Sequence, residues 1–118
     1  MSYDLELLDP KTDELIEFDK PHHLTGGTYA VGGTTGAWLN MTYNYSPILY
    51  RVFGKHGIRA LDGMTADRSK ILLNKVIQGL GTDVSDDYWE CTEGNVRKAL
   101  SDVLAIASER PDGYWKVM

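Results

Sequence analysis

The 118-residue chain has a single cysteine, Cys91, and no run of eighteen apolar residues. One cysteine excludes an intrachain disulfide, so the fold needs no oxidising compartment. A helix that spans a bilayer needs about twenty consecutive apolar residues, and none occurs here. The first residues are acidic and lack the basic flank of a signal peptide. We therefore expect a soluble, cytoplasmic protein that has no membrane partner.

Charge is missing from one long stretch, residues 21–50, which contains no Asp, Glu, Lys or Arg. The net charge of the whole chain is −5, which argues against binding to nucleic-acid phosphates. Acids dominate residues 1–20 and 82–93, whereas bases dominate residues 51–81. Such blocks either pair within the fold or meet a partner of mixed sign.

The composition, 42% hydrophobic and 25% charged, is typical of one globular domain over residues 1–118. Alternation of apolar and acidic residues at 3–7 predicts a half-buried strand. Turn residues at 9–12 lead to a second apolar run at 15–18, so an N-terminal hairpin is expected. The longest strand is predicted at 37–45.

Three helices are predicted from apolar residues spaced three and four apart. The first begins at Ser46 as its N-cap, the second follows Thr65 and runs to Gly81, and the third runs from Thr92 to Pro111. Strands come first and helices follow. This order favours an α+β fold, in which about three helices pack on a small antiparallel sheet.

The predicted strand at 37–45 has one apolar face and one face of uncharged polar groups. The polar face consists of Trp38, Asn40, Thr42 and Asn44. Amides both donate and accept hydrogen bonds and indole offers a stacking plane, as in ligand pockets and interface hot spots. We predict a ligand- or partner-binding site there, with Tyr29, Thr34, Thr35 and Arg59 contributing. The alternative is that both asparagines only tie neighbouring loops to the sheet.

Five glycines occur within eleven residues, at positions 26, 27, 32, 33 and 36, interleaved with threonines. Backbone N–H groups and hydroxyls of such a segment can cradle an anion. The spacing matches neither the dinucleotide fingerprint nor the P-loop. Hairpin turns and a β-bulge are the simpler explanation of the glycines.

Metal and acid–base chemistry have little support in the sequence. Adjacent His22 and His23 point to opposite sides of an extended strand and match no zinc spacing. Cys91 has no basic neighbour to activate it. The five acids from Asp83 to Glu93 are expected in a solvated loop, where docking to a basic partner is favoured over proton transfer. No metal and no cofactor is expected.

Several short motifs are spread over nearly the whole chain: Gly26-Gly27-Thr28-Tyr29, Gly32-Gly33-Thr34, Ala37-Trp38-Leu39-Asn40, Thr42-Tyr43-Asn44-Tyr45, Phe53-Gly54, Gly57-Ile58-Arg59 and Arg110-Pro111-Asp112-Gly113. This set resembles a small family of uncharacterised proteins from bacteria, their phages and prophages. The resemblance implies no established activity, cofactor or catalytic residue. Its phage association implies a role directed at the host, such as blunting a defence system.

Three classes of function stay open. The first is a non-enzymatic binding protein, for example a phage-encoded inhibitor that caps a host protein or sequesters a nucleotide signal. The second is an enzyme acting on a nucleotide-like ligand, which needs a desolvated carboxylate or histidine beside Asn40 or Asn44. Arg59, Asp62 and His22 are the nearest candidates for a charged group, although Arg59 and Asp62 are expected to form a structural pair. The third is an oligomeric assembly protein whose Trp38 face is a subunit interface.

Overall fold

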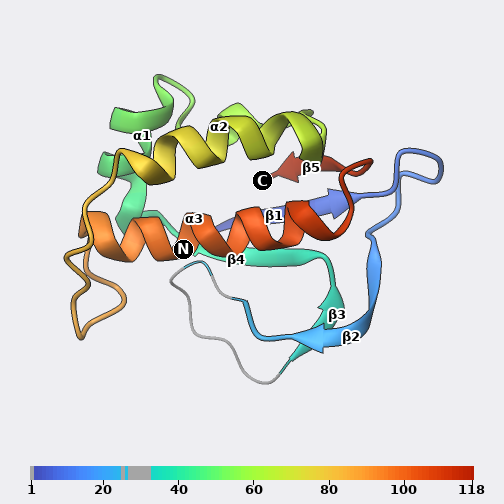
Figure 1. Cartoon of the computed structure of the whole chain (residues 1–118), viewed down its shortest axis with the longest axis horizontal. Coiled ribbons are helices and arrows are strands. Elements are labelled where there is room, and N and C mark those ends of the chain that lie inside the picture. The colour runs from blue at the N-terminus through green and yellow to red at the C-terminus, as the bar shows by residue number, and fades with distance from the viewer. Residues whose placement is uncertain (1, 25, 27–32) are drawn as a thin grey trace.

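The computed structural model describes residues 2–24, 26 and 33–118, and it has the expected α+β architecture (Figure 1). A three-stranded antiparallel sheet has the order β4-β1-β5, and β2 pairs with β3 in a second sheet. The strands are β1 (Ser2–Leu8), β2 (Glu17–His22), β3 (Thr34–Gly36), β4 (Trp38–Thr42) and β5 (Tyr114–Val117).

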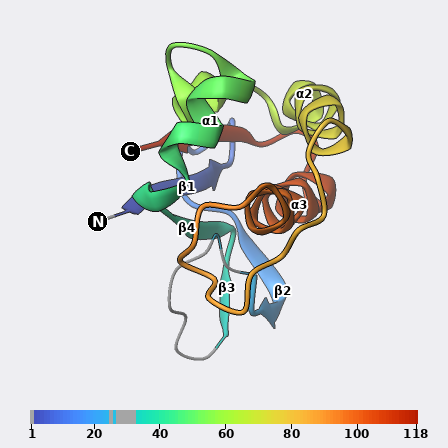
Figure 2. The same cartoon turned by 90° about the vertical axis from the view of Figure 1, so that its left-hand side faces the viewer.

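The helices cover one face of the three-stranded sheet, where α2 and α3 lie side by side (Figures 1 and 2). The α-helices are α1 (Ser46–Phe53), α2 (Ala66–Gln78) and α3 (Glu93–Glu109), and the 3₁₀ helices are η1 (Tyr43–Tyr45) and η2 (Gly57–Leu61). In the described part of the chain, no helix combines the length and apolar character that a bilayer crossing requires.

β1 lies at the centre of the sheet and has the predicted alternation. Tyr3, Leu5 and Leu7 are buried, whereas Asp4 and Glu6 are only partly buried. The buried side chains meet the core face of β4 and the helices, so the period-two pattern indicated the correct faces.

The predicted N-terminal hairpin, in which the strand at 15–18 pairs along the strand at 3–7, is not formed as a continuous pair of strands. The turn forms, and a bridge joins Leu8 to Leu15, but β2 pairs with β3 instead of β1. Both edges of β1 are taken by β4 and β5, which present buried apolar side chains. β2 is mostly exposed and contains Pro21, which lacks a backbone N–H, so it is the weaker partner.

The strand predicted at 37–45 as the longest is β4, which has only five residues, against seven in β1, and ends at Thr42. The Thr42 hydroxyl accepts a hydrogen bond from the backbone N–H of Asn44 at 3.2 Å and caps η1. The alternation of faces therefore stops before Asn44. A further strand, β5, was missed, because the sequence indicated only a turn followed by Tyr114 and Trp115.

Two of the three predicted helix caps are present. The Thr65 and Thr92 hydroxyls accept from backbone N–H groups in the first turns of α2 and α3. Ser46 is not the N-cap of α1, which is Tyr45: it is the first residue of the helix, and its hydroxyl is hydrogen-bonded to the Tyr3 hydroxyl at 2.7 Å. α2 ends with Gly79 as its C-cap, two residues before Gly81.

Candidate functional site

The outer face of the β1–β4 pair gathers two of the predicted site residues with two acids. The antiparallel register places Trp38 opposite Glu6 and Asn40 opposite Asp4. The Asn40 side-chain amide donates a hydrogen bond to the Asp4 carboxylate. Together with Leu15, these four residues line a shallow hollow of about 430 Å³. The face that the sequence predicted as uncharged therefore carries two carboxylates from the neighbouring strand.

Thr42 and Asn44 do not belong to this hollow. Thr42 is buried, with 1% of its surface exposed, and its hydroxyl caps η1. The Asn44 side chain donates to the backbone carbonyl oxygen of Trp89 at 3.0 Å. Asn44, in η1, thus ties the loop between α2 and α3 to the segment that follows β4.

The remaining predicted site residues are dispersed. The Thr35 hydroxyl donates to the Glu17 carboxylate at 2.5 Å, and the Thr34 hydroxyl accepts from a backbone N–H within β3. The Arg59 guanidinium lies 4.9 Å from the ring centroid of Tyr3, a cation–π contact. Its expected partner, Asp62, instead accepts from the backbone N–H of Val117 at 2.9 Å. Tyr29 lies outside the described residues.

A second surface is the loop between α2 and α3, and its backbone is held by side chains from elsewhere in the fold. The Tyr45 hydroxyl donates to the Tyr88 carbonyl oxygen at 2.5 Å, next to the contact from Asn44. Asn95, with 5% exposure, accepts from the Ser85 N–H at 3.2 Å. Its amide also donates to the carbonyl oxygens of Asp87 and Glu90, at 3.1 and 2.9 Å.

This loop exposes apolar side chains although its backbone is fixed. Six large hydrophobic side chains are exposed in the described part of the chain, and Val84, Tyr88 and Trp89 are three of them. Sequence reasoning singled out the loop's acids but not its aromatic residues. The Tyr88 and Trp89 rings contact each other, with centroids 5.1 Å apart.

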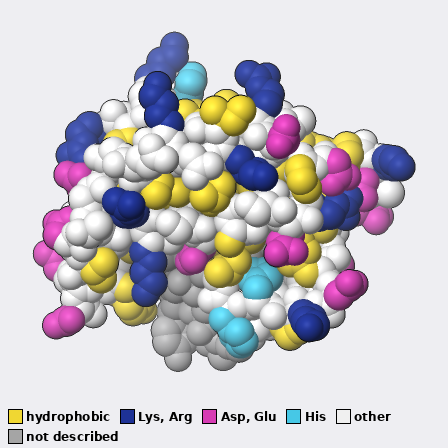
Figure 3. Space-filling model, viewed as in Figure 1, with side chains coloured by type: hydrophobic (Ala, Val, Ile, Leu, Met, Phe, Trp, Pro, Cys, Tyr) yellow, Lys and Arg dark blue, Asp and Glu magenta, His cyan; other side chains and the backbone are white. Residues whose placement is uncertain are grey.

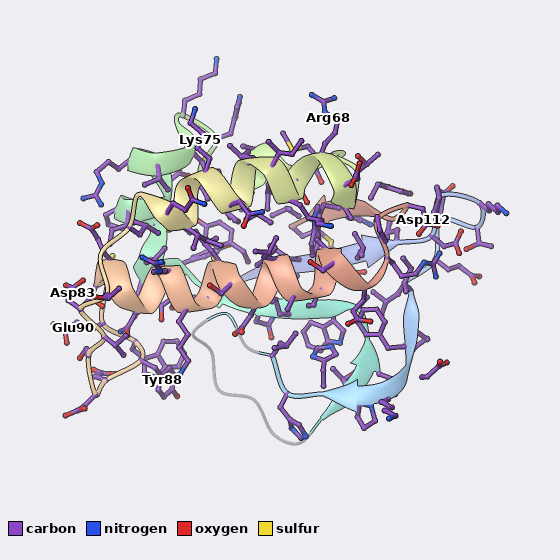
Figure 4. All side chains as sticks on the ribbon, viewed as in Figure 1. Arg68, Lys75, Asp83, Tyr88, Glu90 and Asp112 are labelled. Carbon is purple, nitrogen blue, oxygen red and sulfur yellow. The ribbon has the colours of Figure 1, made fainter. Side chains whose placement is uncertain are left out.

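Acidic residues flank Tyr88 and Trp89 in the sequence of the loop. Asp83, Asp86, Asp87 and Glu90 are exposed in the loop, as predicted, but the fifth predicted loop acid, Glu93, is the first residue of α3, is only partly exposed and forms an ion pair with Arg51 at 3.2 Å. Figure 4 shows Asp83, Tyr88 and Glu90 together on the loop beside the N-terminal end of α3. Apolar rings and negative charge therefore share one surface. We define this surface, residues 84–90, as the aromatic loop.

A third feature is a cleft of about 610 Å³ between β2 and α3. Phe18, Leu24 and Ile106 give it apolar walls, and Figure 3 shows hydrophobic and histidine side chains on this face. The His22 ring also lines the cleft, and its Nδ1 accepts from the Leu24 N–H at 3.2 Å. Nε2 therefore carries the proton and donates to the Gly36 carbonyl oxygen at 2.6 Å. Both ring nitrogens of His22 are thus engaged in hydrogen bonds with backbone groups.

Arg110 lies at the rim of this cleft and is already paired. Its guanidinium donates to the carboxylates of Asp112, at 2.9 Å, and Asp9, at 3.3 Å. The hydrogen bond from Arg110 lowers the pKa of Asp112 below its ordinary value. A bound anion would have to compete with these two carboxylates for the guanidinium.

Among the described residues, no three His, Cys, Asp or Glu side chains are placed to hold a metal ion. Comparisons with family models, curated proteins and solved structures give no significant match to this chain.

Proposed function

We propose that the protein is a non-enzymatic binding protein that docks on a basic surface of a protein partner through the aromatic loop. The main observation is that, of the six large hydrophobic side chains exposed in the described part of the chain, three lie within residues 84–89. Single exposed hydrophobic residues are ordinary, but a cluster favours an interaction site. Tyrosine and tryptophan are also enriched among the residues that dominate interface energies.

The fixed backbone of the loop supports this proposal. Tyr45, Asn44 and Asn95 hold five backbone groups of the loop by side-chain hydrogen bonds. Association costs free energy for every segment that must be ordered on binding. A loop already held in one conformation avoids part of that cost.

The charge around the rings defines the partner. Asp86, Asp87 and Glu90 are exposed beside Tyr88 and Trp89, and they repel anions and attract lysine and arginine side chains. Charges at the rim of an interface act mainly on association rate and specificity, so the aromatic rings supply most of the affinity.

One concrete form of this function is a phage-encoded inhibitor that caps a host defence protein. The motif resemblance supports that form, and the acidic character of the loop fits a basic target. The enzymatic alternative has weaker support from the described contacts. Asp4, the partner of Asn40, is partly exposed, and the partner of Asn44 is a backbone carbonyl oxygen.

Affinity capture from a bacterial lysate tests the proposal. Three tagged proteins are compared: the wild type, the double variant Tyr88→Ser/Trp89→Ser, and the control Ile71→Ser. Ile71 is 75% exposed but lies on α2, outside the loop. We expect a basic protein to be retained by the wild type and the control and lost from the double variant, with retention falling as salt rises.

Two results contradict the proposal. One is retention of the same proteins by the double variant, and the other is retention that does not change with salt. The circular dichroism spectrum and melting temperature of each variant show that the fold is kept. Sizing chromatography of the wild type separates a partner protein from self-association, which is the assembly alternative.

A further inference from the structure

The hollow on the outer face of the β1–β4 pair contains a carboxylate without a hydrogen-bond or ion-pair partner among the described residues. This carboxylate belongs to Glu6, and the Trp38 indole side chain lines the same hollow. Both side chains are partly exposed, and they lie opposite each other in the register. The neighbouring Asp4 carboxylate accepts from the Asn40 amide, which leaves its remaining lone pairs available.

We propose that this hollow binds an organic cation, namely an alkylammonium or guanidinium group. Two carboxylates on one strand supply the negative charge, and an indole ring attracts a cation through its π electrons. Leu15, at the edge of the hollow, offers an apolar contact for the alkyl part of the ligand. The inference comes from the strand register and is independent of the aromatic loop.

The same geometry disfavours an anionic ligand. A phosphate in the hollow would face the carboxylates of Asp4 and Glu6, and like charges at close range repel. A nucleotide signal, one of the ligands that the sequence left open, is therefore a poor fit to this face.

Lys116 is the cation nearest in register, because it lies opposite Glu6 on β5. Its side chain is exposed and lines a different hollow, with Tyr114 and Asp62. The ion pairs in the described part of the chain do not include one between Glu6 and Lys116. Lys116 thus weakens the negative potential of the site without occupying it, and its removal provides a diagnostic variant.

Nuclear magnetic resonance titration of the whole chain tests the proposal. The probe is agmatine, which carries a guanidinium and an ammonium group, and the neutral control is butylurea. Concentrations reach roughly 50 mM, enough to saturate a site with a millimolar dissociation constant. The chain gives three indole N–H signals, of which that of Trp38 reports on the site. The variant Trp38→Phe identifies this signal by its loss.

We expect agmatine to shift the Trp38 indole and Asn40 amide signals saturably, and butylurea to leave them in place. Glu6→Gln removes one charge and no hydrogen bond, so affinity should fall by about threefold or more. Lys116→Gln should raise affinity by about twofold, an effect that a purely structural role of Glu6 would not produce.

The result that overturns the proposal is the absence of a saturable shift at Trp38 and Asn40, or equal shifts with butylurea. Unchanged affinity in Glu6→Gln also overturns it. A capped tripeptide, acetyl-Gly-Arg-Gly-amide, identifies the source of the cation. Tighter binding of the tripeptide than of agmatine indicates an arginine side chain of a protein, and the reverse indicates a free small cation.

Discussion

The hydroxyl of Tyr45 donates a hydrogen bond to the carbonyl oxygen of Tyr88, 43 residues further along the chain and 2.5 Å away. The Tyr45 side chain is 1% exposed, whereas that of Tyr88 is 42% exposed. One tyrosine is therefore a core residue that fixes the backbone of the other. The side chain of the second is free to meet a partner because its backbone is held from inside the fold.

Replacing Tyr45 by phenylalanine should loosen the aromatic loop. The loss of this hydrogen bond leaves a carbonyl oxygen without its partner and costs about 1–2 kcal/mol of the free energy of unfolding. Amide hydrogen exchange should quicken over residues 84–91. Tyr43→Phe is the matched control, because the Tyr43 hydroxyl bonds to no described residue. Equal exchange in the two variants would show that Tyr45 does not hold the loop.

Alkaline pH should destabilise the protein through the same residue. Burial, with smaller effects from Cys91 and Asp87, raises the pKa of Tyr45 to about 12 from 10.0. Since the folded pKa lies above the unfolded one, the stabilisation is complete below pH 10 and is lost as pH rises toward 12.

Urea unfolding at several pH values checks this dependence. Between pH 10 and about 12, wild-type stability should fall more steeply than that of Tyr45→Phe. Tyr114, whose pKa is raised by its hydrogen bond with Asp13, contributes to both proteins and cancels in the comparison. If the stability of the two proteins fell with pH at the same rate, the alkaline sensitivity would come from residues other than Tyr45.

Asn95, in the first turn of α3, should be the most sensitive of the polar side chains that hold the aromatic loop. Its buried side chain serves three backbone groups, so Asn95→Ala should lower the free energy of unfolding by about 2–3 kcal/mol. Ser101→Ala, at an exposed position on the same helix, should stay within about 0.5 kcal/mol. Chemical denaturation measures the free energy of unfolding of both variants. Equal losses in the two would show that Asn95 does not hold the loop.

Gly94 should not tolerate a methyl group. A Cβ atom there would lie 2.6 Å from the backbone of Asp83 and Val84, so the loop would have to move off α3. At Gly79 the nearest atom would be 3.6 Å away, an ordinary contact. Gly94→Ala should cost more than about 2 kcal/mol, whereas Gly79→Ala should be neutral or slightly stabilising. Thermal melts decide between this difference and a similar effect at both positions.

Local signals predicted much of the fold. The alternation at residues 3–7, the threonine caps of α2 and α3, and the stop before Pro111 depend on neighbours in sequence, and the structure contains them all. Ser46 failed as an N-cap because η1 runs directly into α1, so that the Ser46 backbone is already helical, and its hydroxyl contacts the distant Tyr3.

The site was harder to predict, because strand pairing is non-local. The sequence identified Trp38 and Asn40, but the acids opposite them follow from pairing of β4 with β1, which no local pattern reveals. The sequence did not predict the exposure of Trp89 either. An aromatic residue is expected in a core, and here bonds from Tyr45 and Asn44 hold the backbone so that the ring stays outside.

Contact between the aromatic loop and a protein partner is the core of the proposed function. Its most direct test is amide hydrogen exchange of the protein alone and in complex with the partner retained in the capture experiment. We expect added protection over residues 84–90 and unchanged exchange over α2. Protection confined to α2 or to the β2–α3 cleft, with none in the loop, would contradict it.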